Sequence, residues 1–322
     1  MAKVFVVVEH RQGLIRDATF ELVSLARELQ SASGLEPTAV VIGHGVRGFA
    51  GTLSKYLPRT FAVENEALAD FRYETYAAVL KDILERETPL VTLCPQSAFG
   101  MELFPRLSVE SQRPCATDCI KVEMDGAGLS VVRSIYNGKI LSRSTFAPSG
   151  GYLVTVRSGS YAPATEAGSA GAVEEFPCPP FKTPFRTEFL GYREAAAGAV
   201  DISQSPFLVS IGRGIKDVEN IPKAQELADR LGAVLSCSRP VVDKKWLGKE
   251  RQVGTSGRTV KPKVYLALGI SGAFQHLAGI KGSGVFIAVN RDAKAPIFRA
   301  ADYGVVEDMF KIIDALKEQS GS

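Results

Sequence analysis

The stretch VYLALGISG at 264–272 decides the fold of the second half of this chain. Its first five residues predict a buried strand, and the glycines that follow predict a turn into a helix. The run FLVSIGRG at 207–214 repeats this arrangement, and VFIAVN at 285–290 is a third strand that ends in a polar turn. A helix predicted at 218–231 leads to a short strand at 233–235. These alternations are typical of parallel βαβ units.

The first half of the chain shows the same alternation. Apolar runs predict buried strands at 4–8, 38–42, 60–63 and 90–93. Apolar residues recur at helical spacing over 19–29 and 71–84, which indicates two covering helices. After Ile120 two extended runs, broken at Asp125-Gly126, and a turn at Asn137-Gly138 predict hairpins.

The segment 158–184 separates the two halves. Ser, Gly, Ala and Pro dominate it, which predicts a connector or extended arm without a packed element of normal length. An alanine-rich stretch at 195–199 follows and leads into the apolar run that begins at Phe207. We therefore place the domain boundary near Val200. The sequence therefore predicts an α/β protein with a mostly parallel N-terminal domain that has a β-rich extension, residues 1–199, and a Rossmann-like C-terminal domain, residues 200–322.

Composition narrows the function classes. The chain has 322 residues, of which 45% are hydrophobic and 23% charged, the balance of a soluble protein with two cores. No run is long enough for a signal peptide or membrane span, so we expect a cytoplasmic protein. The five cysteines form no C-x-x-C pair, which argues against a zinc or iron–sulfur site and for reduced thiols. His10 and His44 are interpreted as structural or solvent-facing.

The charge is unevenly divided. Residues 201–322 carry 18 Lys or Arg against 13 Asp or Glu, whereas residues 1–200 carry 20 against 22. This dispersed excess, with few aromatic residues beside it, is weak support for nucleic-acid binding. An anionic cofactor accounts for it equally well.

The strand-end glycines indicate where such a cofactor would bind. In open α/β sheets, ligands lie outside the carboxyl ends of the strands, where glycines let the backbone approach and free N–H groups face a phosphate. Gly212-Arg213-Gly214 is not a full G-x-G-x-x-G motif, because Asp217 stands where the third glycine would be. The glycine turns alone leave NAD and FAD open as ligands.

Longer motifs carry a resemblance to a known family. The C-terminal runs are SRPVVD at 238–243, QVGTSGRTVKPKVYLALGISGAFQHLAGI at 252–280 and VFIAVNRDAKAPIFRAADYGVVEDMF at 285–310. The N-terminal ones are VVVEHRQGLI at 6–15, FRYETYAAVL at 71–80 and SAFGMELFPRLS at 97–108. Together they resemble the α (large) subunit of electron-transfer flavoproteins, the family that includes the FixB proteins, over nearly the whole chain.

The resemblance implies that the C-terminal domain binds FAD. Arg239 would lie over the isoalloxazine ring, Ser256 would hydrogen-bond flavin N5, and His276 would reach the C2 carbonyl. Asn290, Asp308 and Met309 match the adenosine end, although Asp308 also reads as a helix-start carboxylate. The other positions that match cofactor contacts of the family are Arg213, Ser238, Gln252, Val253, Gly254, Thr255, Gly269, Ser271, Gly272, Ala273, Phe274 and Gln275.

The chain departs from the family pattern near the expected flavin. Pro240 follows the serine-arginine pair where small residues are usual, and Lys244-Lys245 stand where Ala-Gly is common. Ser256 replaces a common threonine and keeps the hydroxyl. FAD binding should survive these changes, which could nevertheless shift the flavin potential.

The family's activity implies an electron carrier that is not an enzyme in its own right. It would pair with a smaller β subunit that binds AMP or a second FAD, and the N-terminal domain would pack on that subunit. Donors would be flavin dehydrogenases of the acyl-CoA dehydrogenase type, and acceptors a quinone reductase or a ferredoxin-linked protein. Two alternatives stay open: a subunit of an electron-bifurcating complex that uses NADH and ferredoxin, and an NAD-binding enzyme on a sirtuin-like scaffold.

Overall fold

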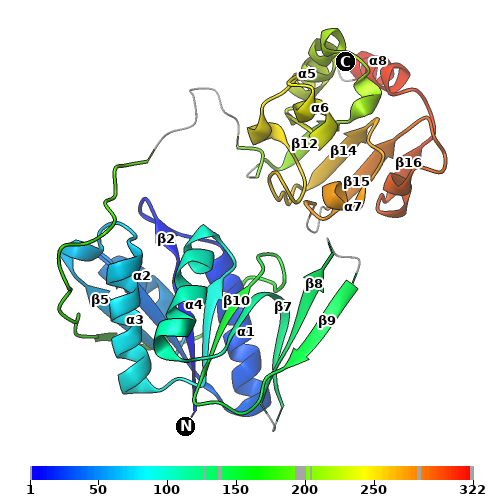
Figure 1. Ribbon diagram of the computed structural model, residues 1–322. Helices are drawn as coiled ribbons and strands as arrows, with labels where there is room; N and C mark the ends of the chain where they lie inside the picture. Colours follow the sequence, from blue (N-terminus) through cyan, green and yellow to red (C-terminus); the bar gives the residue numbers. More distant parts are fainter. Residues whose placement is uncertain are drawn as a thin grey trace. The chain divides into compact units, whose positions relative to one another are not determined.

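The chain folds into two compact units, Met1–Gly191 and Tyr192–Ser322. The computed structural model describes residues 2–125, 128–136, 140–192, 201–203, 205–280 and 284–319. The stretch 195–199, the boundary expected near Val200, and the turns expected at Asp125-Gly126 and Asn137-Gly138 lie wholly or partly outside these residues. Each unit is built on its own sheet (Figure 1).

The first unit contains a nine-stranded mixed sheet with the order β11-β5-β4-β1-β6-β10-β7-β8-β9. The strands from β11 to β7 are parallel, and β7, β8 and β9 are antiparallel. Their bounds are β1 Lys3–Val7, β4 Glu36–Gly43, β5 Arg59–Glu64, β6 Val91–Pro95, β7 Cys115–Asp125, β8 Gly128–Ile135, β9 Ile140–Thr145, β10 Tyr152–Val156 and β11 Ala172–Glu175. The four predicted parallel strands and the β-rich extension are confirmed.

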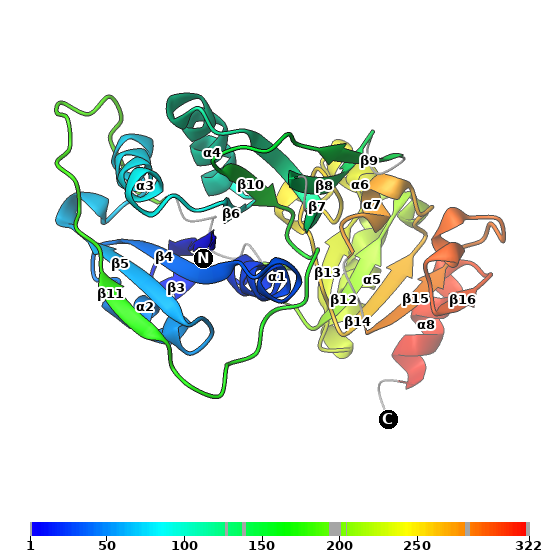
Figure 2. The same ribbon diagram turned by 90° about the horizontal axis from the view of Figure 1, so that it is seen from below.

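Helices cover both faces of this sheet. The alternating side chains of β1 explain the arrangement: Val4 and Val6 pack with α1 and α2 in one core, and Phe5 and Val7 pack with α3 and α4 in the other. Figure 2 shows α1 and α2 on one side of β4 and β5, and α3 and α4 on the other. The helices are α1 Ala18–Ser33, α2 Arg47–Ser54, α3 Tyr73–Glu87 and α4 Ala98–Ser111. The two predicted helices are α1 and α3.

Two strands of this sheet depart from the sequence-based expectation. Strand β10 returns to the sheet in parallel between β6 and β7, where we expected only hairpins. Strand β11 lies in the segment 158–184, where we expected a connector or extended arm and predicted no strand, and its four residues Ala172–Glu175 pair with β5 at the edge. A four-residue edge strand gains its hydrogen bonds from its neighbour, and local composition does not encode them.

The second unit contains a five-stranded parallel sheet with the order β13-β12-β14-β15-β16. The strands are β12 Phe207–Ile211, β13 Val234–Cys237, β14 Val264–Leu268, β15 Val285–Val289 and β16 Tyr303–Val305. The helix predicted at 218–231 begins with a 3₁₀ turn, Val218–Asn220, and continues as α5 Ile221–Arg230, with proline in its first turn. Helix α8 Met309–Gln319 packs beside α5 on the same face.

The other face of this sheet has no long helix among the described residues. It is covered by the segment around Val253 and Val260, the four-residue helix α7 Phe274–Leu277 and the 3₁₀ turn Pro296–Arg299. Gly254, Gly257 and Pro262 disfavour a long helix in the segment around Val253 and Val260. The unit is thus a parallel α/β fold whose second covering layer is mostly irregular.

In the described part of the chain, none of the helices has both the length and the apolar character needed to cross a membrane.

Candidate functional site

The carboxyl edge of the second sheet gathers the polar and glycine-rich turns. Because the five strands are parallel, the residues after each strand meet along one edge. Gly212-Arg213-Gly214 follow β12, Ser238 and Arg239 follow β13, and 269–272 follow β14. Asn290 follows β15, and Asp308 and Met309 lie beyond β16. The chain passes from β12 to β13 on one side and crosses to β14 on the other, so the strand order reverses between β12 and β14.

Backbone approaches backbone closely at this reversal. Gly212 N donates to Leu268 O at 2.9 Å, and Gly214 N donates to Gly269 O at 3.0 Å. A Cβ at Gly212 would lie 2.4 Å from Gly269 O, and one at Gly214 would lie 2.7 Å from Gly269 Cα. Gly269 itself has φ +64°. Packing therefore requires glycine at 212 and 214, and the positive φ of Gly269 favours glycine there as well.

The loop after β14 presents a row of unused donors. Among the described residues, nothing accepts a hydrogen bond from the peptide N–H groups of 270–274. Gly272 in this loop has φ +83°, and a Cβ there would lie 2.2 Å from Ile297 N. Asn290 Nδ2 donates to Ile270 O at 2.8 Å and ties the loop to the end of β15. These five successive N–H groups, which we call the cradle, have no acceptor among the described residues and are of the kind that binds a phosphate or another anion.

Charged side chains flank the cradle. Arg213 is exposed, and the carboxylate of Asp308 lies 3.8 Å from Lys216 Nζ and 3.6 Å from Arg291 Nη1. Asp308 Oδ1 also accepts from Phe310 N at 2.9 Å, which confirms its role at the start of α8. Sequence reasoning missed Lys216 and Arg291, since neither lies in a glycine turn.

The loop 252–258 lies beside the end of β13. Val253 N donates to Cys237 O at 2.9 Å, and Thr255 N donates to Gln275 O at 2.8 Å, so this loop joins β13 to the segment before His276. The buried Gln252 donates from Nε2 to the Oγ of the exposed Ser256 at 2.8 Å. Because Ser256 Oγ accepts this bond, its own proton stays available to a ligand.

His276 is buried beneath this loop. Its Nδ1 lies 3.1 Å from Val253 O, which can only accept, so Nδ1 carries the proton. Its Nε2 lies 2.8 Å from Tyr265 Oη and therefore accepts from that hydroxyl in the neutral ring. Burial lowers the pKa of His276 to about 4. To donate to a flavin carbonyl, Nε2 would have to gain a proton, and the Tyr265 hydroxyl would have to turn away. The expected C2 contact stays a prediction.

Tyr265 was not predicted from the sequence. It lies within the apolar strand β14, is fully buried, and precedes His276 by 11 residues. No local pattern marks such a partner, because the contact arises only when α7 folds back over the sheet.

Arg239 and Ser238 begin α6, Arg239–Asp243. The Arg239 side chain is 69% exposed, and its Nε lies 3.4 Å from Asp243 Oδ2. Ser238 is buried, and its N–H donates to Ile211 O at 3.0 Å. Direct hydrogen bonds of the backbone thus bring the predicted residues to one edge of the sheet, at 238–239, 252–256 and 269–276. The side chains of Arg213 and Arg239 are exposed to solvent.

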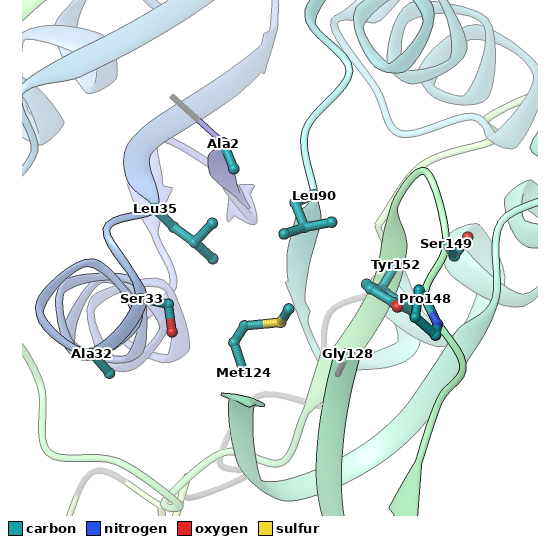
Figure 3. A pocket seen from close by; sticks show the side chains of 10 residues that line it. All are labelled: Ala2, Ala32, Ser33, Leu35, Leu90, Met124, Gly128, Pro148, Ser149 and Tyr152. Atoms are coloured by element: carbon teal, nitrogen blue, oxygen red, sulfur yellow. The ribbon is translucent and has the colours of Figure 1, made fainter. Parts of the chain in front are cut away.

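A separate cavity lies in the first unit. It has a volume of about 490 Å³ and is lined mainly by apolar side chains, among them Leu35, Leu90 and Met124 (Figure 3). Ala2 and Leu90 directly precede β1 and β6, so the cavity lies at the amino edge of that sheet. Among the described residues that line it, Tyr152 alone is titratable, and its hydroxyl donates to Ala147 O at 2.7 Å.

Comparison with known proteins identifies the family. Residues 4–180 match the electron transfer flavoprotein domain, and residues 201–281 match the electron transfer flavoprotein FAD-binding domain. The electron transfer flavoprotein subunit alpha of Syntrophomonas wolfei is 35% identical over 317 residues, 98% of each chain. That of Thermoanaerobacterium thermosaccharolyticum is 33% identical over 98% of this chain and 97% of its own.

The chain belongs to the electron transfer flavoprotein alpha-subunit family. The resemblance seen in the sequence is confirmed, and so is the alpha-subunit role in electron transfer that it implied. Protein FixB of Clostridium saccharobutylicum is also a relative, at 30% identity over 98% of this chain and 96% of its own. The sirtuin-like alternative finds no support.

One further relative of this electron transfer flavoprotein chain has a more specific description. The LctC subunit of a lactate dehydrogenase (NAD(+),ferredoxin) from Acetobacterium woodii is 34% identical over 314 residues, 97% of this chain and 75% of the relative.

Proposed function

We propose that the unit formed by residues 192–322 binds FAD along the carboxyl edge of its sheet, and that the chain relays electrons through it as an alpha subunit. The observation that carries the proposal is the row of free N–H groups at 270–274, beside backbones that approach at Gly212, Gly214 and Gly269. Such a cradle suits the pyrophosphate of a dinucleotide. Redox chemistry would come from the bound flavin, while the chain binds, orients and tunes it.

The remaining predicted residues would hold the two ends of FAD. Ser256 and Arg239 lie on the side of β13, and a guanidinium there would stabilise the negative charge that a flavin acquires on reduction. Asn290, Asp308 and Met309 lie on the side of β15 and β16, which would take the adenosine end. The order of the strands thus matches the order of the expected contacts along an extended ligand.

Ser256 offers a direct test of the flavin end. We expect Ser256→Ala to weaken FAD binding by about fivefold to tenfold, since one hydrogen bond contributes about 1 kcal/mol. Ser256→Thr keeps the hydroxyl and should bind FAD like the wild type. Titration of the apoprotein with FAD, followed by flavin fluorescence, measures both variants. Equal affinity of all three proteins would remove Ser256 from the site.

The family implies a β subunit as the partner of this chain. We propose that the first unit packs on it, that the β subunit holds AMP or a second FAD, and that flavin dehydrogenases of the acyl-CoA dehydrogenase type supply the electrons. A quinone reductase or a ferredoxin-linked protein would receive them. In this scheme the chain is a carrier and transforms no metabolite itself.

Flavin quantitation on the heterodimer tests the proposal. Co-expression with a β subunit should yield a yellow complex with one FAD in the alpha subunit, and a colourless complex that does not take up added FAD would contradict it. The number of FAD molecules per heterodimer separates a simple electron carrier from a bifurcating complex: one FAD plus AMP indicates the carrier, and two FAD indicate bifurcation. Bifurcation is included in the test because one relative is the LctC subunit of a lactate dehydrogenase (NAD(+),ferredoxin).

A further inference from the structure

The positive charge of residues 201–322, which we interpreted above as dispersed, is in fact concentrated in one part of the chain. Residues 239–263 contain eight Lys or Arg and two Asp or Glu, whereas the rest of 201–322 contains ten and eleven. The net excess therefore comes from these 25 residues. Three of the cations, Lys244, Lys245 and Lys249, lie on the turn between α6 and Gln252, which we call the lysine turn.

The lysine turn is held at the carboxyl end of β13. Lys245 N donates to Val242 O at 2.8 Å, and Trp246 N donates to Val241 O at 3.1 Å. At the far side of the turn, Arg251 Nη1 donates to Leu235 O at 2.7 Å, and Gln252 forms a parallel bridge with Cys237. The first end of the turn is thus bound to α6, which directly follows β13, and the far end returns to β13 itself, beside the loop that contains Ser256.

The three lysines are exposed and lack acidic partners. None of them forms an ion pair with another described residue, whereas the nearby Arg239 pairs with Asp243. Lys244 Nζ lies 4.2 Å from the centroid of the Trp246 ring, which restrains its stem. Lys245 adopts φ +59°, a conformation that a lysine rarely takes. Uncompensated like charges on a restrained turn repel one another, so they favour a ligand that brings negative charge.

We propose that the lysine turn is a docking surface for a redox protein with an acidic surface around its own electron-transfer centre. The inference rests on the proposed function, because the turn borders the edge at which the flavin would lie. A small charged patch mainly affects the rate at which two proteins associate. Complementary patches raise the association rate steeply at low salt, and the effect is lost at high salt because the ions screen the charges. The lysine turn would bind the acidic surface of the partner, and its position would bring the partner's redox centre to the edge at which the flavin would lie.

The test uses the FAD-loaded heterodimer and two redox proteins of opposite charge. A reduced plant-type ferredoxin, which is acidic, delivers one electron to the flavin, and basic ferricytochrome c removes one. Stopped-flow absorbance gives the second-order rate constants at low and high ionic strength. We expect Lys244→Glu/Lys245→Glu to slow the ferredoxin reaction at low salt by about tenfold or more and to flatten its salt dependence. The cytochrome reaction should not slow.

A matched control exists in the same unit. Lys261 and Lys263 are exposed, and Lys263 N donates to Pro206 O just before β12, which places this pair at the amino edge of the sheet. Lys261→Glu/Lys263→Glu changes the net charge equally, and we expect it to alter the ferredoxin rate by less than about twofold, because salt screens charges beyond about 10 Å.

Three outcomes would overturn the proposal. Equal slowing by the two double variants would show that only total charge matters, and wild-type kinetics for Lys244→Glu/Lys245→Glu would show that the turn does not meet the partner. Binding to phosphatidylserine–phosphatidylcholine vesicles that depends on the lysine turn, with unchanged ferredoxin kinetics, would assign the turn to a lipid surface. Failure of the proposed function would look different, because the wild-type heterodimer would then carry no flavin in this subunit.

Discussion

Gly272→Ala is expected to abolish stable FAD binding in the alpha subunit. The new Cβ would lie 2.2 Å from Ile297 N and 2.4 Å from Ile297 Cα, so the backbone of the loop has to move. The move displaces the N–H groups of 270–274. Losing two hydrogen bonds to a charged phosphate costs about 3 kcal/mol or more, which weakens binding by about a hundredfold. Flavin absorbance per heterodimer after gel filtration measures the loss.

Gly232→Ala is the control for this substitution. Gly232 also has a positive φ, +62°, but a Cβ there has no neighbour within 4 Å, and the residue precedes β13 at the amino edge. Both variants bear the strain of alanine in a left-handed conformation, about 1 kcal/mol, and only Gly272→Ala disturbs the cradle. A normal flavin content in Gly272→Ala, with circular dichroism unchanged, would refute the assignment of the phosphate site.

The second large effect concerns acid stability. Burial holds the pKa of His276 at about 4 in the folded chain, against about 6.5 when the chain is unfolded. The folded state therefore prefers the neutral ring. The stability that the neutral His276 contributes to the fold is fully present at pH values above the unfolded pKa. It is lost as the pH falls from about 6.5 towards about 4, which lowers the free energy of unfolding by up to about 3 kcal/mol.

Urea unfolding of the wild type and His276→Gln at pH 7 and at pH 4 measures this contribution. Glutamine has no proton to gain, so the stability difference between the two proteins should shrink by about 3 kcal/mol between these pH values. A constant difference between wild type and His276→Gln across the pH range would show that the ring is not held neutral by burial.

Much of the fold was predictable because its signals are local. Apolar runs marked β1, β4, β5 and β6, and the helical spacing of apolar residues marked α1 and α3. The run at 152–156 carried the same signal as these strands, but its place between β6 and β7 depends on a crossover that no local pattern encodes. The edge strand β11 is shorter still and forms only by pairing with β5.

The candidate site, too, was predictable where its signals are local and unpredictable where they depend on tertiary contacts. Its glycine turns and the motif around 252–280 were visible in the sequence, and the comparisons confirmed the family that those motifs indicated. The individual contacts of Arg239, Ser256 and His276 with a flavin stay predictions. The structure added the link from Gln252 to Ser256 and the partner of His276, Tyr265.

The sequence by itself thus determined the alternation of strands and helices, the glycines at the strand ends and the family, because each depends on residues that are close along the chain. Only the tertiary structure decided the order of the strands and the neutral state of His276. It also decided that, within the described residues, the N–H groups at 270–274 have no acceptor and the lysine turn has no ion pair. These depend on which groups find a hydrogen-bond or charge partner across space, and that is settled when the parallel strands bring their carboxyl ends to one edge.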